Sequence, residues 1–314
     1  MRLPLWLILL IALVKAPFVH TGGQINIFAN AKKKELPEKI RIIEKASESA
    51  LLETQLRSYV PPKEYHLVVV IPSYNNAEWY KLNLDSVFAQ DYKNFSVVYV
   101  DDASSDRTGS LVQKYITEKK QEHKTTLILN KERQGACANW YKAINMLPPD
   151  VVVISIDGDD WLAKPTVLSL INKIYNKYEC LLTYGSYQVY PKMQYKFSND
   201  KQLPNYVIKN SKYRSYRWTT SHLRTFKAGL FQRIEKKDLE YKGKFFFANC
   251  DLGIMFPMLE MAGDRSVYVP DVLYIYNRAT SLNDSKVLKT HSPLSWYIRG
   301  HQKRYTLLPP GVAY

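Results

Sequence analysis

The sequence has few cysteines, and they are not spaced to hold a metal or a disulfide framework. Its 314 residues include three cysteines, at positions 137, 180 and 250. Zinc sites and disulfide-rich scaffolds use closely or regularly spaced cysteines, whereas these three are widely separated. Both classes are therefore excluded. Three cysteines fit a reducing compartment, and one free thiol in an oxidising compartment is the alternative.

The chain also lacks a compact nucleic-acid-binding motif, an internal repeat and a low-complexity tract. It is nevertheless strongly basic, with 44 Lys and Arg residues against 29 Asp and Glu residues and a formal charge of +15. A basic protein attracts anions. Because no nucleic-acid motif accompanies the charge, we expect anionic partners such as nucleotide sugars or an anionic membrane surface, and no nucleic acid.

No apolar run reaches the length of an ordinary membrane-spanning helix. Leu3–Val14 is continuously apolar and follows Arg2, but it is shorter than the roughly 20 residues that a span needs. It suits the core of a signal peptide, or an anchor extended through Ala16–Val19. We therefore predict a signal peptide or membrane anchor over 1–22, and a protein that is membrane-associated or in the secretory pathway. Lysines on the far side of the run leave the membrane orientation open.

The segment after this leader is predicted to be a stem. Glu35–Tyr59 is highly charged with a narrow apolar stripe, which favours a helix. Pro61-Pro62 is a plausible boundary between this helix and the rest of the chain. The sequence thus predicts a helical stem or linker over 23–62 and one large domain over 63–314.

Strand-like and helix-like blocks alternate from Leu67 onward. The expected strands are Leu67–Ile71, Phe95–Val100, Thr126–Leu129 and Val151–Ile156, and the expected helices are Trp79–Ala89, Thr108–Lys119 and Ala136–Met146. This order predicts an α/β fold, with a mostly parallel sheet flanked by helices. In such sheets, ligands bind at the carboxyl ends of the strands.

Polar clusters come directly after three of these predicted strands, at 72–76, 101–106 and 157–160. The last cluster packs Asp157, Asp159 and Asp160 around Gly158. Like charges so close repel one another unless a cation or hydrogen-bond donors hold them, and a hard divalent metal with oxygen ligands is a simple solution. The alternative is a solvated acidic turn. Carboxylates gathered at more than one strand end favour a functional site.

These clusters resemble the motifs of the inverting family 2 glycosyltransferases, which have the GT-A fold, a Rossmann-like fold. The matching segments, in order, are Val70-Ile71-Pro72-Ser73-Tyr74-Asn75, Val100-Asp101-Asp102-Ala103-Ser104-Ser105-Asp106 and Asp157-Gly158-Asp159-Asp160. The resemblance implies a metal-dependent, inverting transfer of a sugar from a nucleoside-diphosphate sugar to an acceptor hydroxyl on a glycan, a lipid-linked molecule or a protein. It implies Mg²⁺ or Mn²⁺ as cofactor. It also divides the domain into a nucleotide-binding half, about 63–162, and an acceptor half, about 163–314.

The resemblance implies a role for each donor-binding residue. Pro72, Tyr74, Asn75 and Asp102 would hold the nucleoside base. Asp157 and Asp159 would form the Asp-x-Asp pair that contacts the ribose and the metal, with Asp160 as the competing metal ligand if the alignment shifts by one residue.

Two arginines are candidates for contact with the diphosphate. Arg133 precedes a predicted helix, where a guanidinium and backbone amides suit an anion; the alternative is an ordinary surface cation. Arg278 lies where relatives often carry a cation or a histidine, and Lys286 is a weaker candidate.

The carboxyl-terminal half contains the candidate catalytic residue. Inversion needs a base that takes the proton from the acceptor hydroxyl. Asp251 stands at the family position for this base, although this chain has Cys250-Asp251 where many relatives have Glu-Asp. The alternative is that Asp251 only caps a helix. His222 and Arg224 are weaker candidates for contact with the acceptor or the diphosphate.

Two rival functions remain open on the sequence. The first is a catalytically inactive nucleotide-binding or scaffold module of the same fold, because the glutamate before Asp251 is missing. The second is a nucleotidyltransferase. That class usually has a glycine-rich, basic phosphate loop after the first strand, which Pro72-Ser73-Tyr74-Asn75 is not.

Overall fold

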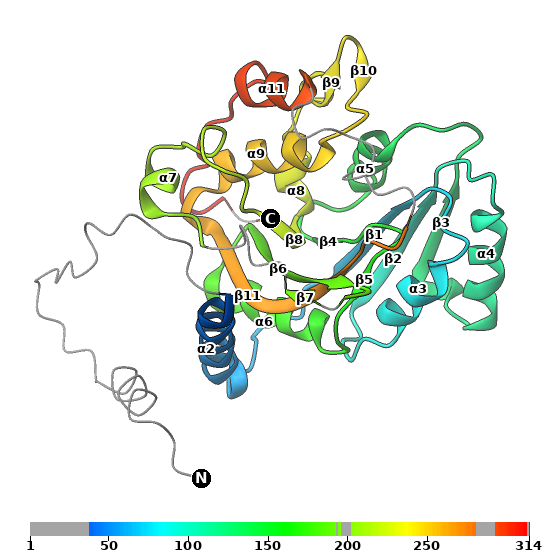
Figure 1. The fold of residues 1–314 in the computed structure, drawn as a ribbon, viewed down its shortest axis with the longest axis horizontal. Coiled ribbons are helices and arrows are strands. Elements are labelled where there is room, and N and C mark those ends of the chain that lie inside the picture. The colour runs from blue at the N-terminus through cyan, green and yellow to red at the C-terminus, as the bar shows by residue number, and fades with distance from the viewer. Residues whose placement is uncertain (1–37, 193, 196–201, 281–292, 313) are drawn as a thin grey trace, which may run out of the picture. The chain divides into compact units, whose positions relative to one another are not determined.

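The computed structural model describes residues 38–192, 194–195, 202–280, 293–312 and 314 (Figure 1). Residues 41–314 form one unit. The strands in these ranges are β1 (Leu67–Ser73), β2 (Phe95–Asp101), β3 (Thr125–Leu129), β4 (Val152–Ser155), β5 (Trp161–Leu162), β6 (Leu182–Tyr190), β7 (Gln194–Tyr195), β8 (Ser221–Lys227), β9 (Glu240–Tyr241), β10 (Lys244–Phe245) and β11 (Ser266–Asn277).

Helices cover the sheet that these strands form. The α-helices are α2 (Glu38–Arg57), α3 (Tyr80–Phe88), α4 (Thr108–Glu118), α5 (Ala136–Asn145), α6 (Val167–Tyr178), α7 (Asn205–Lys209), α8 (Ala228–Phe231), α9 (Cys250–Ala262) and α11 (Pro293–Gly300). Short 3₁₀ helices are η1 (Glu122–Lys124), η2 (Lys236–Leu239) and η3 (Gly263–Arg265).

The described strands, apart from the β9–β10 pair, form one nine-stranded mixed sheet. Its order is β3-β2-β1-β4-β8-β6-β11-β5, with β7 beside β6. The first four strands in this order are mutually parallel. β8 is antiparallel to both β4 and β6, β11 is parallel to β6, and β5 is antiparallel to β11. The carboxyl ends of β1, β2 and β4 therefore meet at one edge of the sheet.

The strands and helices predicted between residues 67 and 156 are confirmed to within a few residues at each end. The prediction succeeds because side chains alternate between the two faces of a strand. In β1, Val68 and Val70 enter one apolar cluster, and Leu67, Val69 and Ile71 enter the other. The whole strand is buried, as expected for a parallel strand with both faces covered.

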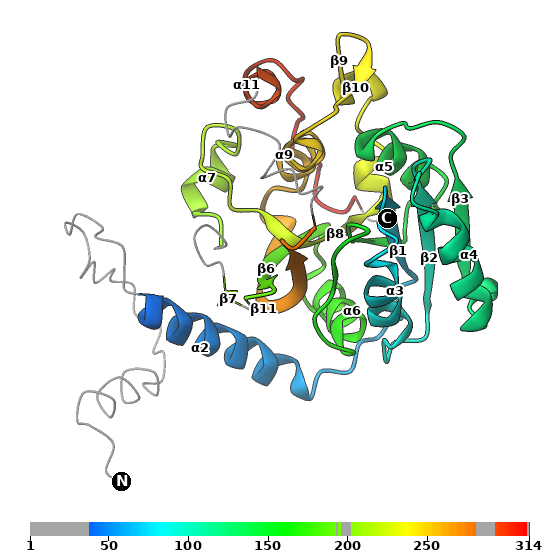
Figure 2. The ribbon, with the colours of Figure 1, turned by 45° about the vertical axis from the view of Figure 1, so that its right-hand side comes forward.

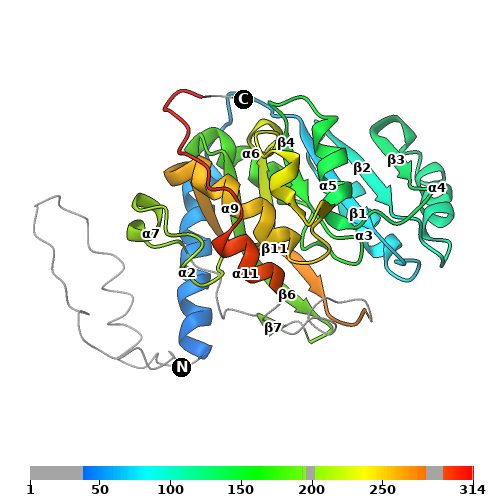
Figure 3. The same cartoon turned by 90° about the horizontal axis from the view of Figure 1, so that it is seen from above.

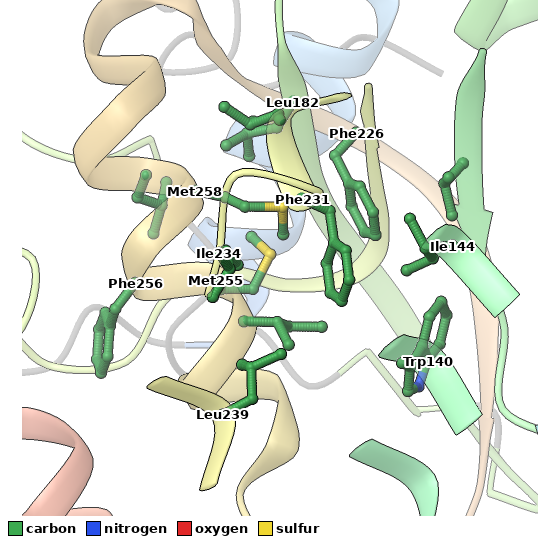
Figure 4. Packing of buried hydrophobic residues seen from close by; sticks show 14 of the residues in the cluster. Trp140, Ile144, Leu182, Phe226, Phe231, Ile234, Leu239, Met255, Phe256 and Met258 are labelled. Carbon is green, nitrogen blue, oxygen red and sulfur yellow. The ribbon is translucent and has the colours of Figure 1, made fainter. Parts of the chain in front are cut away.

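The two faces of the sheet carry different helices. The first apolar cluster contains side chains from α5, α8 and α9, and the second contains side chains from α3, α4 and α6. Seen from above, α5, α9 and α11 lie in front of the sheet (Figure 3). Figure 4 shows the first cluster, where Phe226 and Phe231 pack against Met255 and Met258 of α9. This packing holds α9, and with it Asp251, against the sheet.

The helix predicted over Glu35–Tyr59 is confirmed as α2. Its carboxyl-terminal end lies below α6 in Figure 2. Lys173 and Lys177 of α6 donate hydrogen bonds from Nζ to the backbone oxygens of Leu56 and Gln55, at 3.2 and 2.9 Å. The end of α2 is thus docked on the domain. The predicted boundaries at 22/23 and 62/63, and the role of 23–62 as a stem, stay predictions.

The predicted localisation needs correction. The sequence led us to expect membrane association through the amino-terminal segment, or the secretory pathway. Within the residues that the structure describes, no helix has both the length and the apolar character to cross a membrane. The charged composition of α2, the longest described helix, accounts for this. The predicted leader over 1–22 lies outside the described residues.

A buried ion pair joins α9 to Arg214, which lies between α7 and β8 and also contacts the carboxyl-terminal segment. Arg214 donates to Glu260 through Nε at 2.6 Å and through Nη2 at 2.9 Å, and both side chains are about 1% exposed. Arg214 also donates to the backbone oxygens of Ile298, Gln302 and Lys303. Removing one partner of such a pair leaves an uncompensated buried charge, which is strongly destabilising.

Glu260→Gln should therefore lower the free energy of unfolding by about 3–5 kcal/mol. Urea unfolding monitored by tryptophan fluorescence would measure the change. The matched control is Glu240→Gln, which breaks the more exposed Lys236–Glu240 pair and should cost less than about 1 kcal/mol. Equal effects of the two substitutions would contradict this interpretation of the buried pair.

Candidate functional site

Three loops meet at the carboxyl ends of β1, β2 and β4, and hydrogen bonds tie the first two together. The Asn75 amide donates to Ser104 Oγ, and Asn75 Oδ1 accepts from the Ser105 amide, both at 2.9 Å. Asp106 Oδ2 accepts from the Ala77 amide at 2.9 Å. Asn75 adopts a left-handed conformation, with φ 53°, which asparagine tolerates. Asn75 therefore shapes the loop, and its side chain is engaged within the protein.

Tyr74, between Ser73 and Asn75, has its ring covered by a cation. The guanidinium carbon of Arg133 lies 3.9 Å from the centroid of the Tyr74 ring, within the range of a cation–π contact. Two residues that the sequence placed in the donor site thus form a cation–π pair. Pro72 lies inside β1, and its backbone oxygen accepts from the Gly158 amide at 3.1 Å.

Asp102 fixes the loop that carries Arg133. Its carboxylate accepts hydrogen bonds from the backbone amides of Gln134 and Gly135, each at 2.8 Å, and from Asn130 Nδ2 at 2.9 Å. Burial alone would raise the pKa of Asp102, but these hydrogen bonds and the neighbouring side-chain amides lower it overall. Asp102 therefore remains ionised and holds the start of α5 against the end of β2.

Gly158 allows the acidic loop after β4 to approach β1. A Cβ atom at this position would lie 2.6 Å from Ser73 Oγ and 2.7 Å from Asn76 Nδ2. Those side chains cannot easily move, because Ser73 Oγ accepts from both Asn76 Nδ2 and the Tyr99 hydroxyl. The flanking Asp157 and Asp159 are partly exposed. Glycine is required here by the close packing of the two loops.

Asp160 is placed differently from its two neighbours. It is buried, and its two oxygens accept from the Tyr274 hydroxyl and the Asn277 amide, both at 2.6 Å. Burial, together with the charges of Asp159 and Asp157, raises the pKa of Asp160 well above its ordinary value. Both carboxylate oxygens thus anchor the acidic loop to β11.

The predicted base lies at the start of α9. Asp251 is in the first turn of the helix, and Asn249 is the N-cap residue. The Asp251 side chain is 32% exposed. Its Oδ1 accepts a hydrogen bond from the Leu252 amide at 2.9 Å, and its Oδ2 accepts one from Arg224 Nη2 at 3.4 Å. The expected start of a helix at this position is confirmed.

The Cys250 thiol, next to Asp251 in the sequence, contacts the Cys137 thiol of α5. Contact with the Cys137 thiol and burial raise the pKa of the Cys250 thiol well above its ordinary value, and the nearby carboxylates of Asp251 and Asp157 add to this shift. Both carboxylates are thus within electrostatic range of one thiol. Contacts also lead from the predicted base to the acidic loop, because Arg224 contacts both Asp251 and His222, and His222 stacks on Tyr274, whose hydroxyl accepts from the Asp157 amide.

The remaining predicted residues lie on β8 and at the end of β11. His222 and Arg224 are both buried in β8, and Arg224 pairs in register with Ser155 of β4. Arg278 comes just after β11, and its amide donates to the Tyr190 oxygen at 3.0 Å. The segment from Tyr274 to Asn277 is the end of β11. Lys286 lies outside the described residues.

The carboxylates of the acidic loop suit a metal ion that is also bound by the phosphates of a substrate. In the part of the chain that the structure describes, no group of three or more His, Cys, Asp or Glu side chains is arranged to hold a metal ion. Mg²⁺ is usually held by one or two carboxylates, water and the phosphates of a substrate. Asp157 and Asp159 would supply such an incomplete set. The residues present therefore fit a cation shared with a diphosphate.

The family model for glycosyl transferase family 2 matches residues 68–238, more than half of the chain. The chain belongs to glycosyl transferase family 2. It is therefore a glycosyltransferase, and the family resemblance that the sequence motifs suggested is confirmed. The match begins in β1 and continues past β8, so it contains the three loops described above.

Curated relatives agree with this family. The chain is 21% identical over 239 residues to the glycosyltransferase GlyG of Streptococcus pneumoniae, covering 73% of this chain and 74% of GlyG. It is 29% identical over 121 residues to the glycosyltransferase GlyA of the same species, covering 38% of this chain and 16% of GlyA. The chain thus spans about one sixth of GlyA.

Solved structures show the same fold. The crystal structure of residues 1–349 of Staphylococcus aureus TarS with UDP superposes with a TM-score of 0.54 at 18% identity. The match covers 74% of this glycosyltransferase and 62% of the TarS chain. This likeness confirms an α/β fold consistent with GT-A. The mixed character of the sheet refines the sequence prediction of a mostly parallel one.

Sequence reasoning missed several residues that build the site. Asn83 in α3 donates from Nδ2 to the backbone oxygens of both Asp157 and Asp160, at 3.0 and 2.7 Å. The sequence carried a signal for Asn83, because this polar residue occupies a buried position of an amphipathic helix. Tyr274 and the Cys137–Cys250 contact involve partners more than 100 residues apart, and no local pattern indicates them.

Gly158→Ala should disturb the acidic loop without removing any polar group. The added methyl group would overlap Ser73 and Asn76, and overpacking of this kind costs about 1–3 kcal/mol. Urea unfolding would measure the loss. The control is Gly300→Ala, where a Cβ meets nothing within 4 Å and the expected change is less than about 0.5 kcal/mol. An unchanged stability of Gly158→Ala would contradict the close packing of the loops.

Proposed function

We propose that this glycosyltransferase takes a sugar from a nucleoside-diphosphate donor, with a divalent cation, and transfers it with inversion to an acceptor hydroxyl. The observation that carries the proposal is the meeting of three polar loops at the carboxyl ends of β1, β2 and β4, where hydrogen bonds join them. We also propose that residues of about 63–162 bind the nucleotide and residues of about 163–314 bind the acceptor.

The base of the nucleotide is proposed to lie against the Tyr74–Arg133 pair. A flat aromatic ring covered by a guanidinium offers stacking surfaces to a planar base. Asp102 acts here through the loop that it holds, because its oxygens already accept two backbone amides. Asn75 and Pro72 contribute through the shape of the neighbouring loop. Arg278, at the end of β11, is retained as a candidate for contact with the diphosphate.

Asp157 and Asp159 are proposed to contact the ribose and the cation. Both are partly exposed, whereas the oxygens of Asp160 are engaged with Tyr274 and Asn277. We therefore assign the metal to Asp159 in preference to Asp160. Mg²⁺ and Mn²⁺ both suit oxygen ligands. When bound, such a cation would stabilise the negative charge of the departing diphosphate.

Asp251 is proposed to be the catalytic base. Its carboxylate takes the proton from the acceptor hydroxyl while that oxygen forms a bond to the anomeric carbon of the sugar. The bond from this carbon to the diphosphate oxygen breaks, and the nucleoside diphosphate leaves from the opposite face. Partial exposure of Asp251, with Oδ1 and Oδ2 held by Leu252 and Arg224, fits this role.

The relatives support the donor class. TarS has been crystallised with UDP and with UDP-GlcNAc, so uridine nucleotides are the first donors to test. The acceptor is proposed to be a hydroxyl of a glycan, a lipid-linked molecule or a protein. Over 99 residues, the chain is also 31% identical to the amylovoran biosynthesis glycosyltransferase AmsB of Erwinia amylovora.

Asp159→Asn should abolish metal-dependent donor binding. In wild-type protein, a nucleoside diphosphate with Mn²⁺ at about 100 times its dissociation constant should add about 2.7 kcal/mol of stability. Thermal unfolding with UDP, GDP, CDP and dTDP, each with and without Mn²⁺, would measure this. The control is Asp264→Asn, which changes an exposed residue and should keep the full stabilisation by the nucleotide and Mn²⁺. A metal-dependent shift that persists in Asp159→Asn would contradict the assignment.

Asp251→Asn should remove catalysis and leave donor binding intact. Loss of a general base typically costs about 10²- to 10⁴-fold in rate. The measurement is release of nucleoside diphosphate from the sugar donor whose nucleotide stabilises the wild type, with Mn²⁺, together with the thermal shift of the variant. A rate within threefold of wild type would show that another group is the base. Binding without any turnover in the wild type would support the inactive-module alternative.

A further inference from the structure

β8 carries two buried polar side chains, His222 and Arg224. Neither the packing of the fold nor the proposed donor binding explains why polar groups are buried there. His222 is 8% exposed and Arg224 is 7% exposed. Side chains so buried offer little surface to a bulky acceptor, which the sequence had suggested as their ligand. Their contacts are instead with each other and with Asp251: Arg224 Nη2 lies 3.3 Å from His222 Nε2 and 3.4 Å from Asp251 Oδ2.

Aromatic rings hold His222 in place. The imidazole stacks on the Tyr274 ring, with centroids 4.4 Å apart and planes 13° apart. Tyr187 meets the imidazole edge-on at 5.8 Å. Enclosed by these rings, the imidazole has little freedom to rotate away from Arg224.

The protonation of His222 suits this contact. Burial, and then the charge of Arg224, lowers the pKa of His222 well below its ordinary value. Because a guanidinium can only donate hydrogen bonds, Nε2 of the neutral ring is the acceptor in its contact with Arg224. Arg224 Nε is buried without a hydrogen-bond partner in the described structure. The guanidinium is thus oriented by the two groups at its Nη2 end, His222 and Asp251.

The same contacts continue to the acidic loop. The Tyr274 hydroxyl donates to Asp160 Oδ2 at 2.6 Å and accepts from the Asp157 amide at 3.2 Å. Asp160, Tyr274, His222, Arg224 and Asp251 thus form a continuous series of contacts. It begins in the loop that holds the proposed metal ligand and ends at the proposed base.

We propose that Arg224 is a positioning residue for Asp251, and that the Tyr274–His222 stack holds Arg224 in register with the acidic loop. This inference rests on the proposed role of Asp251 as base. Arg224 fixes Oδ2 and the Leu252 amide fixes Oδ1, so rotation of the carboxylate about its Cβ–Cγ bond is restricted. The remaining lone pairs then have one fixed direction toward the acceptor hydroxyl. Catalytic hydrogen bonds are often long without substrate, as this 3.4 Å contact is.

The physical coupling is tested without reference to activity. Urea unfolding midpoints are measured for Arg224→Gln, Asp251→Asn and the double variant. Residues in contact give non-additive effects, whereas independent residues give additive ones. We expect the double variant to differ clearly from the sum of the two single shifts. Strict additivity would overturn the proposal, whatever reaction the protein catalyses.

The catalytic consequence is tested with UDP-GlcNAc, GDP-mannose and dTDP-glucose in the presence of Mn²⁺, by release of the nucleoside diphosphate. Arg224→Gln should lower kcat by about 10- to 100-fold and change the KM for the donor by less than about threefold. In the Asp251→Asn background, the same substitution should cause no further loss. Arg224→Lys should recover part of the rate. The control, Arg217→Gln, changes an exposed arginine and should keep the wild-type kcat.

The outcomes separate the two proposals. A raised donor KM with unchanged kcat in Arg224→Gln would overturn positioning and assign Arg224 to the diphosphate. A further loss in the Asp251→Asn background would show that Arg224 acts independently of Asp251. If the wild type releases no diphosphate from any donor, the proposed function fails. The unfolding cycle then still decides whether Arg224 and Asp251 are coupled.

Discussion

The parallel pairing of β1 with both β2 and β4 is the constraint on which the candidate site depends. It places the carboxyl ends of three strands side by side, with β1 in the middle. Loops that are far apart in the sequence are then close enough to exchange hydrogen bonds. The approach is so close that Gly158 leaves no room for a side chain between β1 and the acidic loop. The proposed donor contacts of the loops after β1, β2 and β4 rely on this arrangement.

The second half of the domain supplies Asp251, the proposed catalytic base. β8 inserts antiparallel beside β4, and α9 packs on the same face of the sheet as α5. This places Arg224 in register with Ser155 and brings the start of α9 to the acidic loop. The proposed donor platform in one half of the domain would therefore be completed by a carboxylate from the other. The proposed chemistry needs both halves to be packed together.

The sequence predicted the parallel part of this architecture because its signals are local. The continuous apolar run of β1, which is buried along its whole length, and the apolar spacing of α3, α4 and α5 appear within single short segments. The polar strand ends were also visible, and so was Asp251 at the start of a helix. Such local signals could not distinguish Asp160 from Asp159 as the candidate metal ligand. The hydrogen-bond donors that occupy Asp160 are Tyr274 and Asn277, more than 110 positions away.

The contact of Asp102 with the loop before α5 has a consequence for recognising this site in other sequences. Asp102 binds backbone amides, so the side chain of Gln134 plays no part in the contact. Any residue except proline can supply the same N–H group. Gly135, with φ 86°, needs glycine for its backbone conformation alone. A related protein can therefore keep these two backbone contacts without sharing the side chain at position 134, whereas the hydrogen bond from Asn130 to Asp102 does depend on a side chain.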